Sequence, residues 1–155
     1  MNEDYVMYCI FSKEAIKAMG GNRGKMASMA GHAFLHAWWD AVEYEHIPFP
    51  SRGFGAPQDQ QIRDEQRRWM TGYQKFQHAS RYKDSGFAKK VTLVVETTDE
   101  LNALYEKLKD LPYGSTLVVD RGLTVFEGPT TVCVGFGPVE KEHVPDALKS
   151  LKVLI

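Results

Sequence analysis

Cysteine is scarce in this chain of 155 residues, which holds only Cys9 and Cys133. Both lie inside apolar runs, YVMYCIF and TVCVGF, where a free cysteine behaves as a small buried hydrophobe. Two such residues provide neither a disulfide framework nor the spacing of a cysteine-based metal site. We therefore expect two buried free thiols.

Long hydrophobic runs are also missing from the sequence. No stretch approaches the roughly 20 apolar residues that a membrane-spanning helix needs. The N-terminal MNED is acidic and the apolar stretch after it is short, so we expect no signal peptide. These features predict a cytoplasmic protein that does not use a membrane as its partner.

Net charge is nearly absent, at −1, so the chain as a whole has no electrostatic preference for nucleic acid. The average conceals a basic segment between residues 60 and 90, where eight Lys and Arg face three Asp and Glu. That local balance of +5 leaves −6 for the remainder. Such segregation can form a basic face that attracts phosphates, although a solvated helix face with a chance excess of arginine explains it equally well.

The composition that is present, 43% hydrophobic and 25% charged, is that of an ordinary globular protein, and its length suits one domain, 1–155. Strands alternating with helices favour an α/β sandwich, and a short connection between the last two strands favours a mixed sheet. Strands are expected at 5–11, 89–97, 115–120 and 130–138, and helices at 24–45, at 62–84 with a possible break at Gly72, after an N-cap at Thr98, and at the C-terminal end. Residues 46–59, rich in proline and glycine, are expected to form an exposed loop.

A first candidate site lies in the stretch DRGLTVFEGPTTVCVGFGP, residues 120–138. Asp120 ends an expected strand, which is where open α/β sheets usually place groups that contact ligands. Thr124 and Thr131 can direct hydroxyls toward this carboxylate, and an acid with nearby hydroxyls can orient a water for acyl transfer. The alternative is a turn whose polar side chains bond only to their own loop backbone.

A second candidate site is GNRGKMASMAGHA, residues 21–33, at the start of a helix. Lys25 stands where free backbone amides can bind an anion, and its charge suits a phosphate or a developing oxyanion. A solvated lysine is an equally good explanation. His32 follows two turns later and His36 one turn further, but no third metal ligand is suggested, so a packed, hydrogen-bonded His32 is favoured over a metal site.

Aromatic residues accompany the basic segment and the first helix: Trp38, Trp39, Trp69, Tyr73 and Phe76. Such rings can stack on nucleobases beside basic side chains. Aromatics at helical spacing more often belong to a core, which is the favoured interpretation here.

Two motifs together carry a family resemblance. GKMASMAGHA, then DRGLTVFEGPTTVCVGFGP and a closing LKVL occur in an order and spacing that resembles the peptidyl-tRNA hydrolase 2 family of archaea and eukaryotes. The resemblance covers the first strand and helix and about residues 89–155, and it leaves roughly 46–80 as an insertion. It implies a mixed four-stranded sheet flanked by helices, a three-layer sandwich, commonly assembled as a homodimer.

The same resemblance implies an enzyme that cleaves the ester between a peptide and the 3′ end of tRNA, with no metal or organic cofactor. The family's functional positions correspond here to Lys25, His32, Asp120, Thr124 and Thr131. Asp120 would position or activate water, the two threonines would hold the water and the ester, and Lys25 would stabilise negative charge.

Three positions depart from the family pattern: Met29 replaces a usual glutamine, Leu123 an often basic residue, and Ser12 a frequent arginine. The alternative to hydrolysis is therefore a module that binds the tRNA end, or a protein, and has lost turnover. Hydrolysis is favoured because the acid, the lysine and both threonines are kept. The basic segment is expected to bind the tRNA substrate through Arg63, Arg67 and Arg68.

Overall fold

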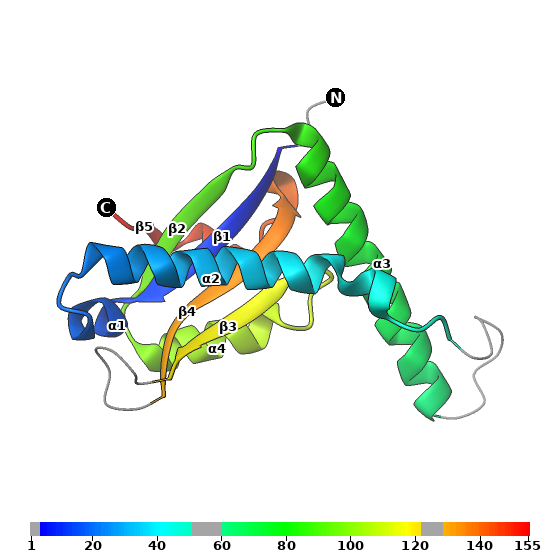
Figure 1. Ribbon diagram of the computed structural model, residues 1–155, viewed down its shortest axis with the longest axis horizontal. Coiled ribbons are helices and arrows are strands. Elements are labelled where there is room, and N and C mark those ends of the chain that lie inside the picture. The colour runs from blue at the N-terminus through cyan, green and yellow to red at the C-terminus, as the bar shows by residue number, and fades with distance from the viewer. Residues whose placement is uncertain (1–3, 51–59, 122–128) are drawn as a thin grey trace.

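The computed structural model describes residues 4–50, 60–121 and 129–155, and it has an α/β architecture (Figure 1). Among these residues, no helix is both long and apolar enough to cross a membrane. In chain order the elements are β1 (Tyr5–Ser12), α1 (Lys13–Ala18), α2 (Arg23–Val42), a 3₁₀ turn η1 (Glu43–His46), α3 (Gln60–Ser85), β2 (Lys90–Val95), α4 (Thr98–Leu108), β3 (Ser115–Asp120), β4 (Thr130–Glu140), a 3₁₀ turn η2 (Lys141–His143), α5 (Asp146–Lys149) and β5 (Lys152–Val153).

The strands form a mixed sheet in the order β3-β4-β1-β2-β5. β1 and β2 are parallel, and every other neighbouring pair is antiparallel. The mixed sheet is confirmed, but the expected count of four strands is wrong, because the two-residue β5 adds a fifth by pairing Val153 with Leu93. Two residues are too few to show the alternating pattern by which a strand is recognised.

Hydrophobic cores on both faces of the sheet follow from the alternation of side chains along the strands. Ile10 packs in the core that contains Leu101 and Leu108 of α4. Its neighbour Phe11 packs in a core on the other face, which contains Met29 of α2 and both cysteines. Cys9 and Cys133 are free and fully buried, as expected. A hydrogen bond with Cys9, together with burial, raises the pKa of the Cys133 thiol, which therefore stays protonated.

Small residues let α2 lie very close to the sheet. Ala33, Ala37 and Ala41 recur on its buried face and have no exposed surface. A Cβ atom added at Gly135 of β4 would overlap the carbonyl oxygen of Ala33, and one at Gly114 would overlap that of Ala37. The close approach fixes the position of α2 over β3 and β4, and with it the side chains along the helix edge.

Three local expectations about helices and loops need correction. α3 is continuous from Gln60 to Ser85, so Gly72 does not break it; a Cβ there would come within 2.5 Å of Ile47 Cδ1, and glycine instead allows this contact. Thr97, not Thr98, caps α4, since its hydroxyl accepts a bond from the Glu100 amide. The expected loop at 46–59 is not exposed throughout: Ile47 is buried, and residues 51–59 lie outside the described part.

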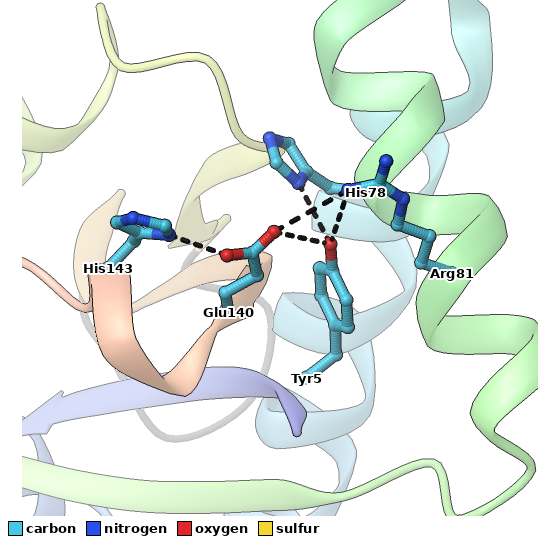
Figure 2. Close-up of polar contacts among 5 residues, drawn as sticks. All are labelled: Tyr5, His78, Arg81, Glu140 and His143. Atoms are coloured by element: carbon cyan, nitrogen blue, oxygen red, sulfur yellow. Dashed lines mark hydrogen bonds and ion pairs between the residues drawn. The ribbon is translucent and has the colours of Figure 1, made fainter. Parts of the chain in front are cut away.

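The C-terminal half of α3 is fastened to the sheet by a polar group that we call the Tyr5–Glu140 cluster: Tyr5, His78, Arg81, Glu140 and His143 (Figure 2). The Tyr5 hydroxyl donates to Glu140 Oε1 at 2.8 Å, and Arg81 Nη1 lies 3.6 Å from the same oxygen. His143 Nδ1 lies 2.6 Å from Glu140 Oε2. Burial raises the pKa of Tyr5 to about 12, and the bond from Tyr5 lowers the pKa of Glu140.

Candidate active site

The first turn of α2 positions Lys25. Gly20 and Gly21 adopt positive φ values of 63° and 71°, which favour glycine, and they turn the chain sharply after α1. Asn22 then caps α2, its side-chain oxygen accepting a bond from the Lys25 amide at 3.0 Å. The Lys25 side chain extends from this fixed turn toward the end of β3.

Asp120, the last residue of β3, meets Lys25 there. Lys25 Nζ lies 2.6 Å from Asp120 Oδ2, and the two side chains are 15% and 7% exposed. Asp120 shares a strand face with Val118, which packs in the core beside α2, so the carboxylate points toward the helix. The structure thus joins the two candidate motifs, 95 positions apart in sequence, in one partly buried ion pair.

The ion pair lies in the wall of a cleft of about 560 Å³ between α2 and β3. The cleft adjoins a second hollow of about 450 Å³ farther along α2, and His36 lines both. The first is lined by Lys25, Ser28, Met29, His32, His36 and residues 117–121. Ser28 and Arg121 were not expected in the site from the sequence; Ser28 could have been found from its position one helical turn after Lys25.

The threonines are placed differently from the expectation. In the β3–β4 ladder Asp120 pairs with Thr130, whereas Thr131 pairs with Val119. Directly paired residues lie on the same face of a sheet, so Thr130 shares the face of Asp120 and Thr131 lies on the opposite face. A register shift between Val118 and Val119 causes this exchange, and nothing in the sequence marks it. Thr124, like Gly122, Leu123 and Gly128, lies outside the described residues.

His32 is exposed and lines the cleft, so the packed, hydrogen-bonded position favoured from the sequence is wrong. Its ring lies 5.7 Å from that of His36, which in turn stacks on Trp39 at 5.0 Å. Across the described residues, no group of three or more His, Cys, Asp or Glu is arranged to hold a metal ion.

The aromatic residues divide into two kinds. Trp39 is 56% exposed, so the core position favoured from the sequence is wrong for this residue. Trp69, Tyr73 and Phe76 of α3 instead pack around the ring of Tyr44, each with its centroid within 5.4 Å. Met29, the departure from the family pattern in α2, is 6% exposed and belongs to both the core and the cleft wall.

The arginines expected to bind substrate lie away from the ion pair. Arg63, Arg67 and Arg68 are exposed on the N-terminal half of α3, before the contact of Gly72 with Ile47. Figure 1 shows this half of α3 extending past the sheet near the C-terminal end of α2, whereas the N-terminal end of α2 lies at the other side. Because the 20 residues of α2 rise about 30 Å, the structure does not bring the arginines to Lys25.

The sequence is similar to those of known proteins over most of its length. The family model described as "Peptidyl-tRNA hydrolase PTH2" matches residues 5–154. A peptidyl-tRNA hydrolase of Methanopyrus kandleri is 30% identical over 86% of this chain and 87% of its own length. One from Sulfurisphaera tokodaii is 38% identical over 42% of this chain, and the match spans about half of that relative, 54%. One from Methanothermobacter thermautotrophicus is 34% identical over 43% of this chain and 60% of the relative.

Proposed function

Because the chain belongs to the peptidyl-tRNA hydrolase PTH2 family, we propose that it hydrolyses the ester between a peptide and tRNA in the cleft where Lys25 meets Asp120. The observation that carries this proposal is the 2.6 Å contact between Lys25 Nζ and Asp120 Oδ2 beside that cleft. Held together next to open space, a carboxylate can serve as general base and a cation can stabilise the oxyanion in ester hydrolysis.

In the proposed reaction Asp120 acts as the general base. A water held by its carboxylate attacks the ester carbonyl carbon and gives its proton to Asp120. The carbonyl oxygen becomes an oxyanion, which Lys25 stabilises; its ammonium has three N–H donors and can bond to Asp120 and to the oxyanion at once. The carbon–oxygen bond to the ribose then breaks, and the proton passes from Asp120 to the ribose oxygen. The products are free tRNA and the carboxylic acid of the peptide, which then loses its proton to solvent.

The other expected site residues enter the proposal with different support. His32 lines the cleft, which supports contact with the substrate. Thr124 remains proposed as a group that holds the water and the ester, on the family resemblance alone. Thr131 is proposed for the same role on that resemblance, although its pairing with Val119 places it on the sheet face opposite Asp120. Thr130, paired with Asp120 in the sheet, is added as a hydroxyl on the face of the carboxylate.

Three further properties are proposed with the activity. The protein acts in translation, in the cytoplasm, and as a homodimer. Sedimentation of the purified chain tests the dimer. The three-layer sandwich is supported by the cores on the two faces of the sheet, one containing α4 and another α2.

The tRNA itself is proposed to bind the exposed arginines of α3. Arg63 and Arg67 are one helical turn apart, which makes a common surface available. Replacing Arg63, Arg67 and Arg68 together with glutamine should raise KM and flatten its dependence on salt, because fewer counterions are released on binding. Turnover at saturating substrate should stay near the wild-type value. An unchanged KM and an unchanged salt slope would assign this surface to solvent or to a protein contact.

A binding module without turnover remains a second candidate, and Met29 favours it. This apolar side chain, 6% exposed, stands in the cleft wall where the family usually has an amide. The experiment that separates the candidates is release of free tRNA from purified peptidyl-tRNA, with Asp120→Ala as the control. Release by the wild type and not by Asp120→Ala supports the hydrolase; binding of peptidyl-tRNA without release supports the module.

A further inference from the structure

Three aromatic rings follow one edge of α2 along the cleft. His32, His36 and Trp39 are spaced four and three residues apart, so their side chains lie above one another on the helix. Their ring centroids are 5.7 and 5.0 Å apart, and the planes of His36 and Trp39 differ by 19°. His36 and Trp39 cover each other on one face, so a planar group of a ligand can stack only on the surface that remains open, which for Trp39 is 56% of the residue.

The ring row connects the two hollows beside α2. His32 lines the hollow of the ion pair, Trp39 lines the second hollow, and His36 lines both. Trp39 leaves 56% of its surface exposed, so a ligand that enters the second hollow can contact its ring. The three rings therefore lie along one edge of α2, beside both hollows.

The two ends of the ring row differ in chemistry. One end reaches Lys25 and Asp120. The other end reaches η1. Just after η1, Ile47 contacts Gly72 of α3. The turns of α3 that precede Gly72 carry the exposed arginines. A polyanion held by those arginines can reach the ion pair along the ring row.

The second hollow contains two acidic side chains, and the charge of one of them, Asp40, is compensated within the protein. Asp40 is held by Lys75 Nζ at 3.0 Å and accepts a bond from the Ser115 amide at 2.9 Å, so its charge is compensated. Glu43 also lines this hollow and is exposed. Replacing Glu43 with glutamine should therefore strengthen the binding of an anionic ligand.

We propose that His32, His36 and Trp39 form a stacking path for the unpaired nucleotides at the 3′ end of tRNA, leading them from the arginines of α3 to the Lys25–Asp120 pair. This inference rests on the proposed function. The bases stack on the rings, and the terminal ribose arrives at the ion pair with its ester bond.

A binding experiment tests the path independently of hydrolysis. The probe is a short single-stranded RNA ending in CCA with a free 3′ hydroxyl, and its control is the same backbone with abasic positions. Trp39→Ala should weaken binding of the RNA about tenfold, within the range for one base stacked on one aromatic ring, and Trp39→Phe should restore most of it. Leu35→Ala is the matched control, since Leu35 is 44% exposed on the same helix but lines a separate hollow.

Kinetics supply the second measurement. Trp39→Ala and His36→Ala should raise KM for peptidyl-tRNA with little change in turnover at saturation. Equal binding of the RNA by the wild type and Trp39→Ala, equal binding of the abasic control, or no binding at all would overturn the path. So would a KM effect that changes with peptide length, because the rings would then contact the peptide. If the wild type binds the RNA through Trp39 but releases no tRNA from peptidyl-tRNA, the path stands and the proposed hydrolysis fails.

Discussion

The Lys25–Asp120 pair and the Tyr5–Glu140 cluster are built alike but differ in what surrounds them. Each joins residues far apart in the chain, by 95 positions in the pair and by 135 between Tyr5 and Glu140. Each places a carboxylate within hydrogen-bond distance of a donor, and each is partly buried. A buried ionic contact therefore does not by itself identify an active site.

The difference is the open space beside the pair. The carboxylate of Asp120 faces a cleft of about 560 Å³, into which a substrate can enter. Both oxygens of Glu140 have partners within the protein, Tyr5 and Arg81 for one oxygen and His143 for the other (Figure 2). The first arrangement suits chemistry, and the second holds α3 against the ends of β1 and β4.

The largest expected effect is on turnover, which should fall when the Lys25–Asp120 pair is changed but not when the Tyr5–Glu140 cluster is changed. Asp120→Asn and Lys25→Ala should each lower turnover about 10²-fold or more, which is the usual loss when a positioned base or a charge-stabilising group is removed. Steady-state release of tRNA measures the loss, and circular dichroism checks that each variant is folded. Glu140→Gln is the matched control and should keep wild-type turnover. A wild-type rate in either site variant would remove that residue from the mechanism.

A smaller effect is expected on the stability of the fold when the Tyr5–Glu140 cluster is changed. Glu140→Gln removes the charge that accepts from Tyr5 and faces Arg81, and we expect the free energy of unfolding to fall by about 1–3 kcal/mol. Denaturant unfolding measures this change. Tyr5→Phe removes one hydroxyl from the same contact and should cost about the same or less. If neither substitution changes the unfolding midpoint, the cluster does not hold α3 in place.

The smallest effect concerns alkaline pH. The pKa of Tyr5 is raised by burial to about 12, above its value of about 10 in the unfolded chain. The stability contributed by the neutral phenol is therefore complete below pH 10 and is lost as the pH rises toward 12. Between pH 9 and pH 11.5 the wild type should lose on the order of 1 kcal/mol more than Tyr5→Phe does. If the free energies of unfolding of the two proteins change in parallel with pH, Tyr5 ionises as readily in the folded chain as in the unfolded chain. That result would contradict the prediction.

The sequence allowed Lys25 and Asp120 to be predicted as candidate site residues, but not the ion pair between them or its surroundings. Lys25 and Asp120 were recognisable because a helix start and a strand end are places where backbone geometry favours ligand contact. The exchange of Thr130 for Thr131 arises from a register shift, which depends on how β3 and β4 pair and has no local signal. The exposure of Trp39 likewise depends on which side of α2 the sheet covers.

The elements of the fold show the same limit. The longer strands and helices have a clear periodicity and were expected close to their observed bounds. β5 has two residues, and it becomes a strand only because β2 offers it an edge. Gly72 favours a helix break by its own propensity, but the contact with Ile47 in the folded chain outweighs that preference.

The central claim is that Lys25 and Asp120 act together in cleaving peptidyl-tRNA, and a double-mutant cycle tests it most directly. Single-turnover release of tRNA is measured for the wild type, Lys25→Ala, Asp120→Asn and the double variant. Because residues that act as a unit are strongly non-additive, the double variant should be about as slow as the slower single variant. If the two losses multiply in the double variant, or if the wild type releases no tRNA, the account is contradicted.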